Sequence, residues 1–139
     1  MGGSIHDQSF AGGDDIVLMK YASNGTRLWT RLSGSENSDS GQAVALDGAG
    51  SVFLAGIARG DVNGEAFSGD PEASDMVIVQ YSSDNSGALV WTKLLGVANY
   101  NELAFALALH NGTIYLAGSS DAPTLYGDAL IGSADAVLV

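Results

Sequence analysis

Apolar residues in this chain form short blocks separated by turns rich in glycine and asparagine. In residues 15–21, large apolar side chains occupy both sets of alternate positions, a pattern typical of a strand buried on both faces. The Asn-Gly pair at 24–25 and the Asn-Ser-Gly run at 85–87 favour hairpin turns. No stretch has the spacing and caps of an amphipathic helix. The pattern predicts an all-β chain.

The blocks repeat along the chain. Residues 15–21 match residues 75–81, and residues 135–139 begin a third copy at the same spacing of 60. Three further blocks recur 62 or 63 residues later: 28–34 at 90–96, 51–56 at 113–118 and 43–46 at 106–109. The spacing changes only in the turns, where insertions cost little.

Each copy reads as four short antiparallel strands, which describes a blade of a β-propeller. We expect one complete blade at 42–96, the outer half of a preceding blade at 1–34, and three strands of a third blade at 103–139. The alanine-rich block at 43–46 would suit the crowded innermost strand. A parallel β-solenoid is the competing fold, although its rungs are usually about 20–30 residues long and have no hairpin turns.

The repeat Asp-x-Val-x-x-x-Tyr, Asn-Gly, Leu-Trp-Thr-Arg, Ala-Val-Ala-Leu-Asp-x-x-Gly-x-Val-x-Leu-Ala-Gly resembles the bacterial seven-bladed β-propeller repeat (SBBP), and its turns resemble NHL-type blades. In the second copy His110 departs from the Asp-x-x-Gly turn, which is one residue shorter there. The resemblance implies a ring of about 420 residues, of which this chain would be a fragment. It also implies an extracellular or cell-surface protein.

An enzyme is the alternative interpretation. Residues 86–91 (Ser-Gly-Ala-Leu-Val-Trp) resemble the tryptophan-docking motif of quinoprotein propellers, except that Ser83 stands where that motif has Asp. The chain would then belong to a quinoprotein-like or hydrolytic propeller whose catalytic residues lie in other blades. No Gly-x-Ser-x-Gly motif is present, and neither histidine has a metal-ligand spacing. We therefore expect no catalytic residues and no enzyme activity in this chain.

Several repeated or clustered residues are candidates for a site. Asp15, Asp75 and Asp135 begin matching strands, where carboxylates either accept backbone hydrogen bonds or form a ring of cation ligands. Trp29 and Trp91 favour packing between blades over stacking on a cofactor. We expect structural roles for all five.

An oxygen-rich loop supplies the candidate metal ligands. Asp61, Asn63, Glu65 and Asp70 suit calcium by residue type, but their spacing lacks the third ligand that an EF-hand has before its glycine. A solvated acidic loop is the alternative. Calcium is the one cofactor that these residues suggest.

Charge narrows the class of partner. The formal net charge is −11, which disfavours nucleic acid and favours a cation or a basic protein. The chain has no cysteine, no apolar run long enough to cross a membrane, and no pattern typical of a signal peptide at residues 1–6.

The acids are unevenly placed. In an up-and-down blade alternate connections lie at opposite ends, and fourteen of the sixteen acids fall in the longer connections: 1–15, 34–41, 59–75, 96–102 and 119–135. We expect a binding or scaffold module whose acidic long-loop face holds a protein, a cationic ligand or a metal ion. Exposed blade edges should also allow self-association.

Overall fold

The computed structural model describes residues 4–69, 72–84, 86–125, 128–129 and 135–138, the last two ranges as backbone only. Every element in these ranges is a β-strand, and all pairs of named strands are antiparallel. The all-β prediction is confirmed. None of the described ranges contains a helix that could span a bilayer.

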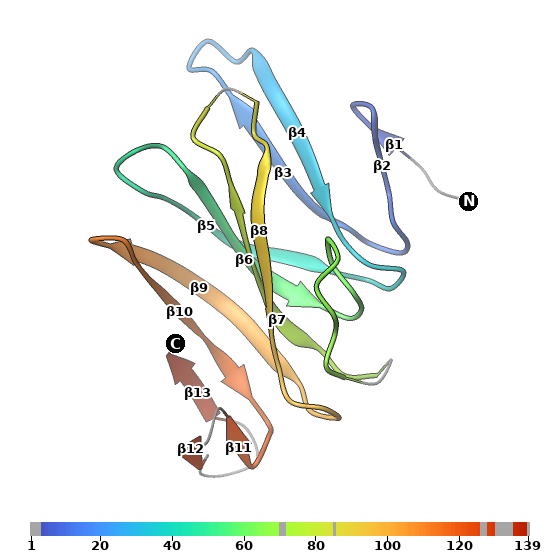
Figure 1. The fold of residues 1–139 in the computed structure, drawn as a ribbon. Coiled ribbons are helices and arrows are strands. Elements are labelled where there is room, and N and C mark those ends of the chain that lie inside the picture. Colours follow the sequence, from blue (N-terminus) through green and yellow to red (C-terminus); the bar gives the residue numbers. More distant parts are fainter. Residues whose placement is uncertain (1–3, 70–71, 85, 126–127, 130–134, 139) are drawn as a thin grey trace.

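Three sheets form the body of the molecule (Figure 1). The N-terminal hairpin contains β3 (Ile16–Tyr21) and β4 (Arg27–Ser33). The central sheet has the order β5-β6-β7-β8, with β5 (Ser40–Leu46), β6 (Val52–Ala58), β7 (Asp75–Tyr81) and β8 (Leu89–Leu95). The C-terminal sheet has the order β13-β10-β9, with β9 (Glu102–His110), β10 (Thr113–Ser120) and β13 (Asp135–Leu138).

Two small hairpins lie outside these sheets. They are β1 (Ser4–Ile5) with β2 (Gln8–Ser9), and β11 (Thr124–Leu125) with β12 (Asp128–Ala129). Both have a counterpart in the central copy, where Val62 and Glu65 form an antiparallel bridge as Ile5 does with Gln8 and Leu125 with Asp128. They were not predicted from the sequence. The His6 ring Nδ1 lies 3.0 Å from Thr30 Oγ1, so the first small hairpin contacts β4.

The three sheets correspond to the three expected groups of strands. The central sheet spans Ser40–Leu95, close to the interval 42–96 expected as one four-stranded unit. The hairpin falls within 1–34, and the C-terminal sheet spans 102–138. The described strands form no closed sheet, so a propeller ring is an inference from the repeat.

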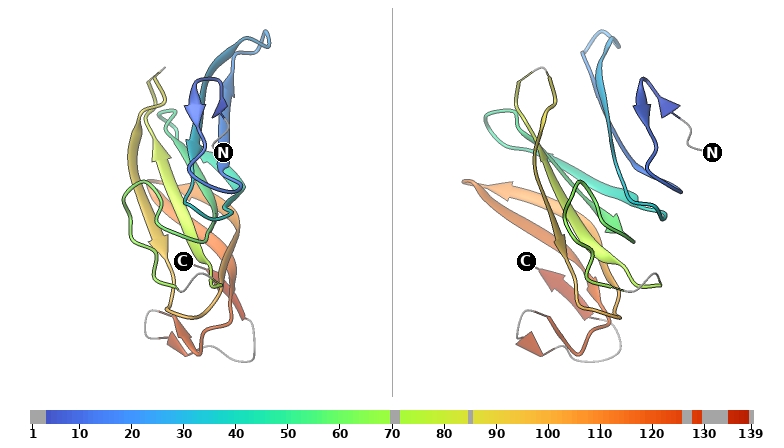
Figure 2. Two further views of the ribbon diagram at one scale, coloured as in Figure 1. Left: turned by 90° about the vertical axis from the view of Figure 1, so that its right-hand side faces the viewer. Right: turned by 45° about the vertical axis from the view of Figure 1, so that its right-hand side comes forward.

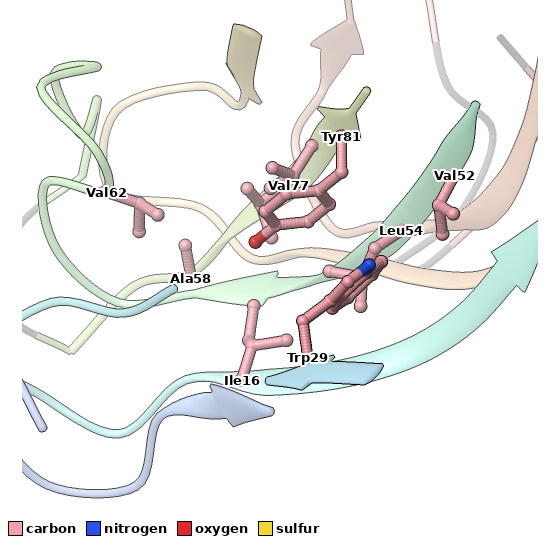
Figure 3. Packing of buried hydrophobic residues seen from close by; sticks show 9 residues of the cluster. Ile16, Trp29, Val52, Leu54, Ala58, Val62, Val77 and Tyr81 are labelled. Carbon is pink, nitrogen blue, oxygen red and sulfur yellow. The ribbon is translucent and has the colours of Figure 1, made fainter. Parts of the chain in front are cut away.

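Each face of the central sheet packs on a neighbour. One cluster joins Ile16 and Trp29 of the hairpin to Leu54, Val77 and Tyr81 of the central sheet, as Figure 3 shows. The other joins the opposite face to the C-terminal sheet through Ala55, Met76, Ile78, Ala104 and Leu116. Successive residues of a strand point to opposite faces, so the continuous apolar sequence of β7 serves both clusters. We call these contacts the first junction and the second junction.

The repeat extends to irregularities of the backbone. The β3–β4 pair has a bulge between Lys20 and Tyr21, and the β7–β8 pair has one between Gln80 and Tyr81, 60 residues later. The β5–β6 and β9–β10 pairs also share a bulge, beside Gly56 and Gly118. Bulges increase local twist. The copies therefore match in shape as well as in sequence.

Candidate binding surface at the long-loop end

The connections alternate between two ends of the sheets. Tight turns join β3 to β4, β5 to β6, β7 to β8 and β9 to β10 at one end, and the longer loops lie at the other (Figure 2). Contacts between the long loops hold them together: Asn37 Nδ2 donates to the Arg59 carbonyl at 2.7 Å, and Ser74 forms a bridge with Asn101. The long-loop end therefore gathers residues from all three sheets.

Two of the repeated aspartates lie against glycines at this end. Asp75 is fully buried and accepts hydrogen bonds from Ser68 N at 3.0 Å and Ser68 Oγ at 2.8 Å. A Cβ at Gly96 would overlap its carboxylate, and a Cβ at Gly34 would overlap the carboxylate of Asp15. Each aspartate therefore accepts a hydrogen bond from the loop before its own strand. Each is also covered by the glycine that directly follows the next strand.

The copies differ in detail. Asp15 is half-buried and accepts one hydrogen bond, from Ala11 N at 2.7 Å, while its Oδ1 is buried without a partner. Asp135 pairs through its backbone with Ser120, and its side chain lies outside the described residues. In both described copies the carboxylate accepts a hydrogen bond from the loop before its own strand.

A second pair of repeated acids joins one sheet to the next through their backbone amides. Asp39 N donates to the Asp14 carbonyl at 2.6 Å, and Glu102 N donates to the Ser74 carbonyl at 2.7 Å. Both side chains are buried. Sequence reasoning counted them among the surface acids, although an acid at matching positions 63 residues apart was a signal for a structural role.

The two linking carboxylates have different donors. Asp39 accepts from the backbone amides of Ser35 at 2.5 Å and Arg59 at 2.8 Å. Glu102 accepts from Val97 N at 3.0 Å and from the Ser120 hydroxyl at 2.7 Å. Burial raises the pKa of Glu102, and the nearby charges of Asp75 and Asp121 raise it further. Burial also raises the pKa of Asp75.

A hollow of about 420 Å³ lies between the loops at this end. Glu36 and Asp61 line it, together with Ser35, Asn37 and Gly60. Asp14, which is exposed, lies on the neighbouring loop that contacts Asn37 and Ser38. We call Asp14, Glu36 and Asp61 the acidic rim. Arg59 lies beside it, and its guanidinium donates to the Ser38 carbonyl at 3.0 Å.

The three described calcium candidates each have partners within the protein. Asp61 Oδ1 accepts from Phe67 N at 2.9 Å, Asn63 Nδ2 donates to Ser33 and Thr92, and Glu65 forms an ion pair with Lys93 at 3.4 Å. Asp70 lies outside the described residues. In the part of the chain that the structure describes, no group of three or more acids or histidines is placed to hold a metal ion.

The two repeated tryptophans lie at the junctions between sheets. Trp29 is buried at the first junction, and its ring centroid lies 6.3 Å from that of Tyr81. Trp91 packs at the second junction, where its ring meets Phe53 edge-on at 6.1 Å. Both rings contact protein side chains in the manner expected of packing residues.

Comparison with curated proteins finds a relative of this chain. No family model matches the chain. The chain is similar to the regulatory protein FlaEY of Caulobacter vibrioides, with 34% identity over 142 aligned positions that include 96% of this chain. The chain spans about 15% of the length of that curated relative. The similarity therefore concerns one segment of a much longer protein.

Proposed function

We propose that the chain is a non-catalytic β-propeller repeat segment that acts as a binding or scaffold module. Support for the blade assignment comes from the 60-residue repeat and the four-stranded central sheet, which is packed on both faces by neighbouring copies. The resemblance to SBBP repeats agrees with this assignment and with an extracellular or cell-surface location.

The acidic rim is the proposed binding surface, and its ligand is a basic protein segment or a metal ion such as calcium. The observation that carries this proposal is the hollow lined by Glu36 and Asp61 in a chain of net charge −11. Loops held on a rigid scaffold are common positions for binding residues. A module that acts by binding also accords with the description of FlaEY as a regulatory protein.

Calorimetric titration tests the acidic rim, with calcium chloride and a lysine-rich peptide as separate probes. Each exposed charge pair contributes about 0.2–1 kcal/mol, so the double variant Glu36→Gln/Asp61→Asn should bind about two- to thirtyfold more weakly than the wild type. Added salt should weaken peptide binding to the wild type.

The matched control removes two charges from the opposite end. Asp47 and Asp84 each accept turn amides through Oδ1, an atom that asparagine retains. Asp47→Asn/Asp84→Asn should therefore bind like the wild type. If both double variants bind equally weakly, the cause is the change in net charge and not the acidic rim. If neither calcium nor the peptide gives heat on titration into the wild type, the proposed binding surface is refuted.

A further inference from the structure

The two junctions consist of matching residues, but among the described residues only the second junction has all of its parts. Strand β3 corresponds to β7 at a spacing of 60 residues, and β5 corresponds to β9 at a spacing of 63. At a spacing of 62, β4 corresponds to β8 and β6 corresponds to β10. Both junctions use the same positions: Ile16 and Met76, Trp29 and Trp91, Leu54 and Leu116. The second junction is therefore a template for what the first junction lacks.

At the second junction, side chains of β6 and β9 cover Trp91 and the apolar residues around it. Phe53 of β6 contacts Trp91, and Leu107 and Leu109 of the next sheet are half-buried there. At the first junction the hairpin contains only β3 and β4, and β3 pairs with no other described strand. No described residue takes the place that Phe53 has at the second junction.

The result is an apolar groove of about 540 Å³ beside β3. Leu18, Tyr21, Trp29, Val44 and Leu46 are among the residues that line it. Val44 and Leu46, the counterparts of Leu107 and Leu109, are 57% and 64% exposed. An exposed apolar groove next to an unpaired strand edge is a site for adding a strand.

The opposite side of the molecule carries the matching strand. Tyr115 of β10 corresponds to Phe53, and it is 41% exposed on the outward face of the C-terminal sheet. The free edge of β10 pairs with β13, whose sequence is Asp-Ala-Val-Leu. The matching sequence at the start of the N-terminal hairpin, residues 15–18, is Asp-Ile-Val-Leu. The pairing of Ser120 with Asp135 reproduces that of Ala58 with Asp75. The edge of β10 therefore fits the sequence of β3.

We infer that a second copy of this chain docks head to tail in the groove. The β3 edge of one copy pairs with β10 of the next in place of the four-residue β13, with Asp15 opposite the partner copy's Ser120. The Tyr115 ring of that copy then packs on Trp29, as Phe53 packs on Trp91. The two surfaces differ, so the contact is heterologous and can extend to a ring or a filament.

Sedimentation of the 139-residue chain, with two blocked variants, tests this contact. Wild type should sediment above 14.2 kDa, increasingly so at higher concentration and at higher salt, because a net charge of −11 opposes association. Leu46→Lys blocks the groove and Tyr115→Lys blocks the inserted face. Each variant alone should be a monomer, and an equimolar mixture should form a dimer and nothing larger.

Val90→Lys is the matched control, since Val90 is 53% exposed on the outermost strand of the central sheet and changes the net charge equally. It should assemble like the wild type. Circular dichroism and thermal melting establish whether each variant folds. If Leu46→Lys or Tyr115→Lys does not fold, Leu46→Ser or Tyr115→Ser takes its place.

Three results would overturn the inference: a wild type that stays monomeric at all concentrations, a mixture of the two variants that stays monomeric, or a Leu46→Lys variant that assembles normally. The last would indicate contact between two identical faces. None of these results bears on the acidic rim, which lies at the long-loop end.

Discussion

The first and second junctions occupy matching positions of one repeat, yet they differ in how completely the same residues are buried. At the second junction Leu107 is half-buried. At the first junction its counterpart Val44 is exposed. The difference teaches that in this fold the neighbouring sheet decides whether a residue belongs to the core.

The largest expected difference between matching positions of the repeat comes from the glycines that cover the two aspartates at the long-loop end. Gly96→Ala would displace the buried Asp75 carboxylate from Ser68 and should lower the free energy of unfolding by about 3 kcal/mol. Gly34→Ala should cost about 1 kcal/mol, because the half-buried Asp15 can turn towards water. Urea denaturation of dilute, monomeric protein measures both, and equal losses would contradict the comparison.

The next largest difference should lie between the two linking carboxylates, Asp39 and Glu102, in the stability lost when each is replaced by its amide. Asp39→Asn leaves one acceptor oxygen for two backbone amides and should cost about 2 kcal/mol. Glu102→Gln can still accept from Val97 N while its amide donates to the Ser120 hydroxyl, so its cost should stay below about 1 kcal/mol. The same urea measurements compare the two, and a larger loss in Glu102→Gln would show that charge matters more than donor type.

A smaller difference should appear between counterparts in the apolar groove and at the complete junction. Leu107→Ala removes a half-buried side chain packed on the second cluster and should cost about 1–2 kcal/mol. Val44→Ala should stay within about 0.5 kcal/mol in the monomer, because Val44 is mostly exposed. A large cost for Val44→Ala under monomeric conditions would mean that residues outside the described ranges cover the groove.

The smallest effect should be the pH dependence of the Glu102→Gln comparison. A carboxyl with a raised pKa favours the folded state most at low pH, and this contribution is lost as the pH rises through the folded-state pKa. Glu102→Gln should therefore compare best with the wild type near pH 7.5, and its relative stability should fall as the pH is lowered towards 4.5. Asp47, Asp84 and Asp121 have lowered pKa values, so acidification destabilises both proteins through these groups. The measurement is therefore the difference in melting temperature between the wild type and Glu102→Gln at each pH.

Most of the strand pattern was predictable because it depends on local spacing. Alternation, turn residues and repeat spacing located the four strands of the central sheet to within a few residues. The small hairpins were not predicted, because β1–β2 and β11–β12 are two-residue strands whose counterpart in the central copy is only the bridge between Val62 and Glu65.

The candidate site was less predictable than the fold. The sequence showed that acids concentrate in the longer loops, but Asp39, Asp75 and Glu102 are buried and accept hydrogen bonds from neighbouring loops and strands. Composition alone cannot separate such a carboxylate from one in solvent, because its donors are distant in sequence or belong to backbone whose path is set by tertiary contacts. Three exposed acids remain in the acidic rim.

By itself the sequence determined that this protein is a repeated antiparallel β structure, because strand alternation and hairpin turns act over a few residues. It also determined which residues in different copies are counterparts. The tertiary structure alone decided that the same leucine or valine position is half-buried at one junction and exposed at the other. Burial depends on the strand packed opposite, and no local pattern records whether that strand is present.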